Sequence, residues 1–238
     1  MGRILITNDD GIGSEGLRRL ADAAAALGEV WVVAPAGQRS AASHSITLHA
    51  ALDVYPCDFP VPGVRAFTCS GMPADCVRVG ALSIMPGKPD AVLSGINYGY
   101  NLATDIQYSA TVGAAMEAAF QGFRAIALSE AASPCHEAAD RYLGELLAEL
   151  MDRPLGYGQI FNVNFPGCAL ADCRGVLRDR KVSRQVMYRD RYNVLEELPG
   201  GGKRLMVEGQ YCEDPEPGTD FRAVVDGYVS VGVLNNIG

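Results

Sequence analysis

Two adjacent acids, Asp9 and Asp10, stand directly in front of a glycine pattern near the start of the chain. The pattern runs from Gly11 to Gly16 and reads Gly-Ile-Gly-Ser-Glu-Gly, which matches the G-x-G-x-x-G spacing of dinucleotide-binding turns. Two carboxylates repel a pyrophosphate, but they attract a divalent cation. The stretch therefore allows two opposite chemistries, a nucleotide cofactor held by the glycines or a metal ion held by the acids.

The dinucleotide interpretation requires a further residue. A cofactor site of that kind has an acid at the end of the second strand, ~20 residues beyond the glycines, which binds the ribose hydroxyls. Here that strand ends in Val-Ala-Pro-Ala-Gly at residues 33–37, which contain no acid. The acids themselves also separate the glycines from the end of the first strand. The sequence therefore disfavours a dinucleotide cofactor.

Side chains with oxygen atoms follow three of the expected strands. The first strand leads into Asn8, Asp9 and Asp10, the second leads to Ser40, and a later strand ends at Asn97. Because ligands of an open parallel sheet bind beyond the carboxyl ends of its strands, these side chains are expected to converge. Two carboxylates, a hydroxyl and an amide oxygen suit Mg²⁺ or Mn²⁺. An Asp-Asp pair alone is also typical of a turn that caps a helix, so the convergence is what favours a metal.

A second group of polar residues is suited to binding phosphate. Ser109 and Thr111 stand at the start of an expected helix, where free N–H groups and small hydroxyls attract an anion. A simple helix cap is the alternative role for each. The other candidate substrate-binding residues lie in the loops that follow the strands, and they are Asn8, Arg39, Ser43, His44 and Asn101. An exposed position for the histidine and a surface ion pair for the arginine stay open.

The elements that must position these residues alternate between strand and helix over residues 1–166. Apolar strands are expected at 3–7, 29–34, 90–97, 125–129 and 160–166, and helices at 17–25, 73–85, 110–122 and 137–151. Buried strands separated by helices are typical of a parallel sheet covered on both faces. We expect an α/β fold, a three-layer α/β/α arrangement with a mostly parallel Rossmann-like sheet and a C-terminal β-hairpin extension.

The pattern changes after Pro166. Short β-like pieces, such as residues 203–211, lie between three consecutive glycines at 200–202 and the stretch EDPEPGTD. We expect residues 1–166 to form the α/β catalytic core. Residues 167–238 are expected to form an extension that carries a hairpin and returns to the core. Because an isolated hairpin is marginally stable in water, this extension is predicted to assemble a homodimer or homotetramer.

Composition narrows the class of protein. The 238 residues are 48% hydrophobic and carry a formal net charge of -8, so neither polymeric nucleic acid nor a membrane surface is an expected partner. No run reaches the ~18 apolar residues of a membrane span. The start of the chain runs directly into a strand pattern with no secretory signal, which predicts a cytoplasmic protein. Seven cysteines without a C-x-x-C pair do not form a zinc motif.

Four stretches together resemble a known family. They read ILITNDDGIGSEGLRRL, VVAPAGQRSAASHSIT, CSGMPADCVRVG and PDAVLSGINYGYNLATDIQYSATVGAAMEAAFQG, and they resemble the survival-protein SurE family of metal-dependent 5'-nucleotidases. The resemblance is dense over residues 1 to 130 and thinner beyond. It implies one divalent cation, Mg²⁺ or Mn²⁺, held by Asp9, Asp10, Ser40 and Asn97. It also implies assembly through the extension. The family usually has glycine where this chain has Ala103 and Ala110, threonine at Met72 and an acid at Ala36.

These residues predict a phosphatase that hydrolyses nucleoside 5'-monophosphates. In this interpretation Asp9 and Asp10 are also the catalytic residues, because a carboxylate beside the metal can accept the proton of the attacking water. No Asp-x-Asp-x-Thr motif is present, which disfavours an aspartyl-phosphate intermediate. Activity on 3'-monophosphates and short polyphosphate is left open. The alternatives are a non-catalytic nucleotide-binding or sensing module on the same scaffold and, more remotely, an oxidoreductase.

Overall fold

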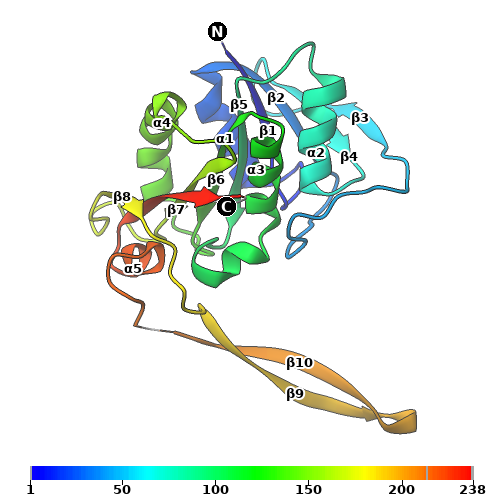
Figure 1. Cartoon of the computed structure of the whole chain (residues 1–238), viewed down its shortest axis with the longest axis vertical. Helices are drawn as coiled ribbons and strands as arrows, with labels where there is room; N and C mark the ends of the chain where they lie inside the picture. Colours follow the sequence, from blue (N-terminus) through cyan, green and yellow to red (C-terminus); the bar gives the residue numbers. More distant parts are fainter. Residues whose placement is uncertain (1, 213, 237–238) are drawn as a thin grey trace.

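A computed structural model describes residues 2–212 and 214–236 of the chain. Within those ranges one sheet of nine strands has the order β3-β4-β2-β1-β5-β6-β7-β11-β8, and β10 and β9 form a separate two-stranded sheet (Figure 1). The strands of the large sheet are β1 Gly2–Thr7, β2 Gly28–Pro35, β3 Val54–Cys57, β4 Arg65–Cys69, β5 Ala91–Tyr98, β6 Arg124–Glu130, β7 Gln159–Phe165, β8 Val176–Arg180 and β11 Val229–Asn235.

The centre of the large sheet is parallel. β1 pairs in parallel with both β2 and β5, and β5, β6 and β7 continue in the same direction. Antiparallel pairs occur toward the edges, where β3 pairs with β4 and β11 pairs with β7. The carboxyl ends of β1, β2, β5 and β6 therefore meet at one edge, as the sequence pattern predicted.

Helices cover both faces of the sheet, which confirms the three-layer α/β/α prediction. Side chains of α1 and α4 pack with one face, and those of α2 and α3 pack with the other. The helices are α1 Glu15–Ala25, α2 Pro73–Val79, α3 Ala110–Phe120, α4 Glu137–Asp152 and α5 Asp220–Val225. α2 is shorter than expected because its last turn widens into a π-helical segment, Gly80–Ile84. A 3-10 turn, Ala103–Gln107, precedes α3.

The glycine pattern at 11–16 has a structural explanation. Gly11 has a φ of 96°, a conformation that L side chains rarely adopt. A Cβ at Gly16 would lie 2.1 Å from the carbonyl oxygen of Ile96, so glycine allows α1 to pack directly against β5. These glycines shape a tight turn and a close helix–strand contact. They keep the two acids at the strand end in a fixed position.

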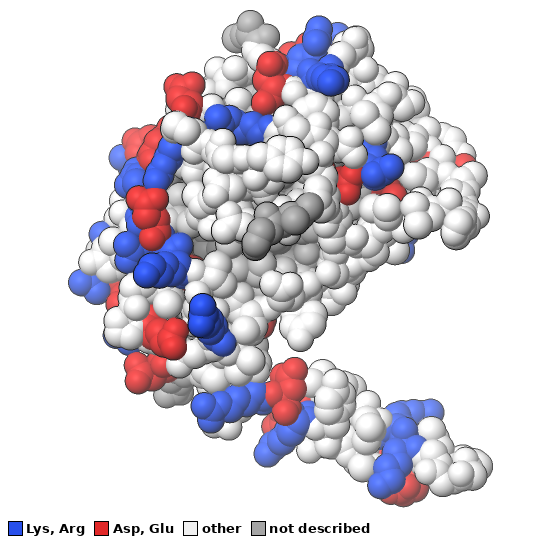
Figure 2. Space-filling model, viewed as in Figure 1, with Lys and Arg blue, Asp and Glu red and all other residues white. Residues whose placement is uncertain are grey.

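The region after residue 166 contributes two strands to the large sheet and also forms a separate hairpin. β8 and β11 join the nine-stranded sheet, whereas β9 (Tyr188–Leu198) and β10 (Gly202–Tyr211) form a long hairpin that extends away from the body (Figures 1 and 2). A short 3-10 turn, Pro199–Gly201, connects its strands. Every described residue of β10 is exposed. In the described part of the chain, no helix has both the length and the apolar character needed to cross a membrane.

Candidate active site

Asp9 is the central residue of the carboxyl edge. It follows β1, and its side chain is buried at 4% exposure. Its Oδ1 accepts a hydrogen bond from the hydroxyl of Thr111, in the first turn of α3. Burial raises the pKa of Asp9 to about 6, the Thr111 hydrogen bond opposes that rise, and the negative charge of Asp10 adds to it. A cation at this position would offset the cost of burying the carboxylate.

Asp10 points to a different part of the edge. Its Oδ2 accepts a hydrogen bond from the backbone N–H of Tyr98 at 3.1 Å, at the end of β5. Thus Asp9 is held from α3 and Asp10 from β5, and the two carboxylates diverge from one strand end. Each carboxylate accepts the hydrogen bond described above and keeps further lone pairs for another ligand.

The loop after β2 is tied to the same strand end. The N–H of Arg39 donates to the carbonyl oxygen of Asp9 at 2.7 Å, which places Ser40 one residue away from this contact. Ser40 is exposed. The Arg39 guanidinium donates to the carbonyl of Ser70 at 3.1 Å. The backbone bond, not the arginine side chain, is therefore the direct link between this loop and Asp9.

Asn97 offers an oxygen at the end of β5. Its side-chain Nδ2 donates to the carbonyl of Gly99 at 2.7 Å, which leaves Oδ1 as the free acceptor of the amide. The N–H of Gly99 in turn donates to the carbonyl of Glu130 at 2.9 Å and anchors the turn to β6. This orientation fits a metal ligand, because a cation binds the oxygen of an amide and not its nitrogen.

Asn8 and Asn101 are buried in hydrogen-bond networks. Asn8 Nδ2 donates to the carbonyl of Gly11 and to Ser14 Oγ, whereas its Oδ1 is buried without a partner among the described residues. Asn101 Nδ2 donates to Ser129 Oγ at 2.8 Å, and its backbone bonds with Asn164. These contacts hold both turns against the sheet.

Ser109 begins α3. Its Oγ accepts a hydrogen bond from the N–H of Val112 at 3.1 Å, so it is the N-cap of the helix. Its hydroxyl hydrogen is still available to a phosphate oxygen. Ser109 can therefore cap α3 and bind a phosphate at the same time.

Ser43 and His44 lie against α3. Ser43 Oγ donates to the carbonyl of Gln107 at 2.8 Å, and His44 Nε2 lies 2.9 Å from Glu117 Oε2. Glu117 also accepts bonds from Arg78 and from a glutamine in the next turn. His44 is thus engaged in an ion-pair network on α3, which the sequence interpretation did not include.

Glu117 and Asp75 are the structural residues that the sequence interpretation missed. Both carboxylates are buried, and Asp75 accepts bonds from the N–H and the hydroxyl of Thr47. The two acids therefore fasten the loop that carries Ser40 to α2 and α3. Glu117 gave a usable signal, because it is the one charged residue of an otherwise apolar helix.

The donor set fits a divalent cation of the hard type. No cluster of three or more His, Cys, Asp or Glu side chains suited to a metal occurs among the described residues. The candidate set has only two such acids, Asp9 and Asp10, and is completed by the hydroxyl of Ser40 and the amide oxygen of Asn97. One buried and one half-buried carboxylate with neighbouring neutral oxygens suit Mg²⁺ or Mn²⁺.

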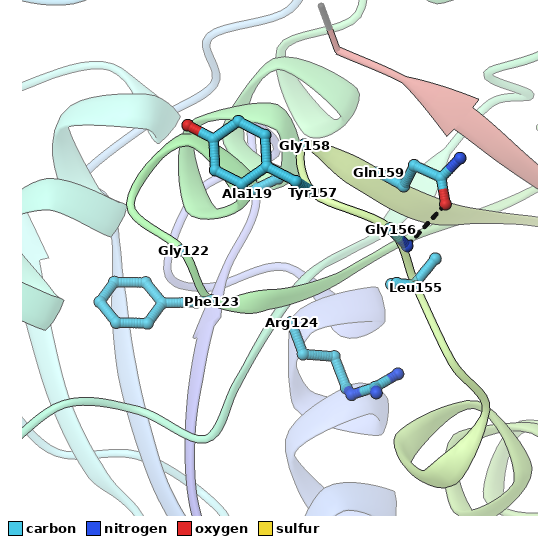
Figure 3. Close-up of a pocket in the computed structure, with 9 residues that line it drawn as sticks. All are labelled: Ala119, Gly122, Phe123, Arg124, Leu155, Gly156, Tyr157, Gly158 and Gln159. Carbon is cyan, nitrogen blue, oxygen red and sulfur yellow. Dashed lines mark hydrogen bonds between the residues drawn. The ribbon is translucent and has the colours of Figure 1, made fainter.

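A separate cavity lies far from these residues. It has a volume of about 250 Å³ and is lined by the starts of β6 and β7, at the opposite edge of the sheet (Figure 3). The Arg124 guanidinium in this lining donates hydrogen bonds to the carbonyls of Leu150 and Arg153. Tyr157, also in its lining, is 83% exposed. Because no acid lines this cavity, the metal chemistry belongs to the carboxyl edge.

Known proteins share both the sequence motifs and the fold. The model of the family described as survival protein SurE matches residues 4–189. The chain belongs to this family. A SurE relative named 5'-nucleotidase SurE, from Synechococcus sp. (strain JA-3-3Ab), is 42% identical over 97% of this chain and 90% of its own length. Another, named 5'/3'-nucleotidase SurE, from Cronobacter sakazakii, is 40% identical over 98% and 90%.

The fold of a solved SurE protein is also similar. The crystal structure of the Aquifex aeolicus SurE protein aligns with a TM-score of 0.84 and 33% identity, covering 99% of this chain and 94% of that one. The resemblance that the motifs at residues 4–20 and 89–122 predicted is confirmed over nearly the whole chain. The similarity therefore includes the extension as well as the core.

Proposed function

We propose that this chain is a divalent-metal-dependent phosphatase that hydrolyses nucleoside 5'-monophosphates to nucleoside and phosphate. The observation that carries the proposal is the pair of carboxylates at the end of β1, one bonded to the start of α3 and the other to the end of β5. SurE relatives that cover nearly the full chain are named 5'-nucleotidases, which supports the same reaction.

In this proposal Asp9, Asp10, Ser40 and Asn97 hold one Mg²⁺ or Mn²⁺ ion. When bound, the ion supplies a Lewis acid that offsets phosphate charge and lowers the pKa of water. The free oxygen of the Asn97 amide and the fixed position of the loop beside Asp9 support this ligand set. Phosphate-ester cleavage depends mainly on positioning and charge stabilisation, which such a set provides.

The chain's own residues supply the remaining steps. Ser109 and the free N–H groups at the start of α3 orient the phosphate. A carboxylate oxygen of Asp9 or Asp10 accepts the proton of the attacking water. Arg39, Ser43 and His44 lie in the loop after β2 that also carries Ser40. Asn8 and Asn101 hold the turns after β1 and β5 in place. The oxygen of the leaving nucleoside takes up a proton from water.

A non-catalytic nucleotide-binding module on the same scaffold is the alternative. Phosphate release from AMP, measured with added Mg²⁺ or Mn²⁺ and again with a chelator, distinguishes the two. We expect release with metal and loss of at least ~100-fold with chelator. Nucleotide binding without release in either metal would overturn the proposal. The same assay with 3'-AMP and short polyphosphate defines the substrate range.

We also propose that the protein is a homodimer or homotetramer that assembles through the hairpin. One face of the hairpin, by strand register, carries Asp190 and Gly209 together with six apolar residues that are 39–67% exposed, namely Tyr188, Tyr192, Val194, Leu205, Val207 and Tyr211. An apolar face on an isolated hairpin needs a partner surface. Light scattering at micromolar concentration should give a dimer or larger. A monomer would contradict this assembly.

The cytoplasm is the location that fits this reaction, because nucleoside monophosphates and free Mg²⁺ both occur there. The net charge of -8 argues against a stable complex with polymeric nucleic acid or with an anionic membrane surface. Binding of labelled duplex DNA at low salt would contradict that part of the proposal.

A further inference from the structure

A small hollow opens beside Asp10 on the face of the sheet that carries α1 and α4. It has a volume of about 170 Å³, and Glu15, Tyr98, Glu130 and His136 are among the residues that line it with Asp10. These come from the start of α1, the ends of β5 and β6, and the N-cap of α4. The hollow thus includes a proposed metal ligand, and no residue of α3 is among the described residues that line it.

The charges on the two sides of the carboxylate pair differ. Three carboxylates line the hollow, from Asp10, Glu15 and Glu130, and no lysine or arginine is among the described residues that line it. The other side offers the N–H groups and hydroxyls at the start of α3. A phosphate dianion is repelled by the first side and attracted by the second. A nucleotide with its phosphate toward α3 then directs its uncharged end into the hollow.

The buried acid of the hollow is already paired. Arg19 Nη1 donates to both carboxylate oxygens of Glu130, at 2.7 and 3.0 Å, and His136 Nδ1 lies 3.1 Å from Oε1. Glu130 is therefore neutralised by Arg19 and lies beside the imidazole, whose Nδ1 is buried without a hydrogen-bond partner among the described residues. The Glu130 side chain is only 5% exposed, which leaves little of it open to a ligand.

Two planar side chains complete the lining. Tyr98 is 55% exposed and is anchored through its backbone to Asp10, and His136 is partly buried beside Glu130. Planar rings of this kind stack on any nucleobase. Cavities that enclose a whole small ligand usually measure about 300–1,000 Å³, so the hollow is large enough for only one end of a nucleotide.

We propose that this hollow receives the nucleobase end of the substrate, which stacks on Tyr98 and His136 while the phosphate lies toward α3. The inference rests on the proposed nucleotidase function and adds the direction in which the substrate lies. It also assigns two residues to affinity for the base that have no role in holding the metal.

The test compares a substrate that has a base with one that lacks it. Initial rates are measured on AMP and on ribose 5-phosphate for wild type, Tyr98→Ala, His136→Ala and the double variant. The matched controls are Tyr157→Ala, an exposed tyrosine at the opposite sheet edge, and His49→Ala, an exposed loop histidine. His136 makes no side-chain cap bond to α4, so its truncation leaves the helix start intact.

We expect kcat/KM for AMP to fall roughly 5- to 150-fold in the site variants, the range that corresponds to loss of one stacked base. The value for ribose 5-phosphate and both control variants should stay near wild type. An equal loss on both substrates would overturn the inference, and so would no loss on AMP. Circular dichroism of each variant identifies any that fail to fold, and Tyr98→Ala, with an exposed ring, then decides.

A binding measurement separates this inference from the proposed function. Ligand-observed NMR with adenosine should show saturation transfer to the base protons in wild type and its loss in the double variant. If no phosphate ester is hydrolysed but adenosine contact depends on Tyr98 and His136, the proposed function fails and the hollow stands. If esters are hydrolysed and adenosine contact is unchanged in the variants, the hollow fails alone.

Discussion

Thr111 donates a hydrogen bond to the buried carboxylate of Asp9, and this contact joins the start of α3 to the end of β1. The two residues are 102 positions apart in the chain. Thr111 is completely buried. The hydroxyl that the sequence suggested for phosphate therefore fixes the orientation of an acid in this structure. A single threonine links the expected anion site to the expected metal site.

Thr111→Val should weaken metal binding without disrupting the fold. Valine has the shape of threonine but cannot donate to Asp9, and removing a hydrogen-bond partner of a metal ligand typically costs ~10–100-fold in affinity. Isothermal titration with Mn²⁺ and the metal dependence of phosphate release measure the effect. Thr104→Val, on a half-buried turn residue, is the control. Unchanged Mn²⁺ affinity in Thr111→Val would contradict the prediction.

Asp10→Asn should abolish turnover and leave the protein folded. The amide oxygen can still accept the N–H of Tyr98, but the negative charge is lost. Loss of one preorganised electrostatic contact in a catalytic site costs about 10²–10³ in rate, so a decrease of that size or larger is expected. Asp22→Asn, an exposed acid on α1, should behave as wild type. Activity close to wild type at limiting metal would remove Asp10 from the metal site.

Glu117 should make stability depend on acid pH. Burial alone would raise its pKa, but hydrogen bonds from His44, Gln121 and Arg78 outweigh burial and lower the pKa from 4.5 to about 2. A folded pKa below the unfolded value gives stability that is fully present above about pH 4.5 and is lost as the pH falls toward 2.

Glu117→Gln tests this dependence. The variant should lose ~1–3 kcal/mol at pH 7, because the charged hydrogen bonds of a buried group are replaced by weaker ones. Its deficit relative to wild type should shrink as the pH decreases from 5 to 2. Urea unfolding at several pH values measures both free energies. A deficit that is constant over that range would show that Glu117 does not carry the charge.

The sequence predicted the sheet because hydrophobic runs are local signals. The strands at 3–7, 29–34 and 160–166 are mainly apolar, and each appears within a residue or two of its expected bounds. The parallel direction of β1, β2 and β5 was predictable because helices connect consecutive buried strands. Convergence of Asp9 and Asn97 at one edge was therefore predictable from the amino-acid sequence alone.

The contacts that orient the site were not predictable in the same way. The hydrogen bond from Thr111 to Asp9, the link from Asp75 to Thr47 and the pairing of Glu130 with Arg19 join residues far apart in the chain. The periodicity of hydrophobic residues along the sequence does not show which distant residues will contact each other. The hollow beside Asp10 could not be predicted for the same reason, because its lining comes from four separate elements.

Ala103 should tolerate glycine better than a helical alanine does. It has a φ of 53°, in the left-handed region where the family usually has glycine, and its N–H donates to Asp220 at 3.0 Å. A non-glycine residue there costs ~1–2 kcal/mol, which Ala103→Gly recovers. Greater freedom of the unfolded chain offsets ~0.4–1 kcal/mol of that gain. Both effects together predict a free energy of unfolding ~0–1.6 kcal/mol above that of wild type.

Ala114→Gly is the matched control for that substitution. Ala114 is equally buried but lies inside α3, where glycine costs about 1 kcal/mol in helix propensity. We expect its free energy of unfolding, measured with urea, to be ~1–2.6 kcal/mol below that of Ala103→Gly. Equal destabilisation of the two variants would show that the turn at residue 103 is not strained.

The last prediction concerns the choice of base. Kinetic discrimination of several thousand-fold requires buried polar groups that are left unpaired by the wrong base. Glu130, the buried acid nearest the proposed base position, is already paired with Arg19, and Ser14 Oγ is bonded to Asn8 and to the N–H of Leu17. Stacking on Tyr98 and His136 contributes ~1–3 kcal/mol for any base. We therefore expect kcat/KM for AMP, GMP, CMP and UMP to agree within ~100-fold. A preference of several thousand-fold for one of them would contradict this expectation and would point to His136 Nδ1, which is buried without a hydrogen-bond partner among the described residues.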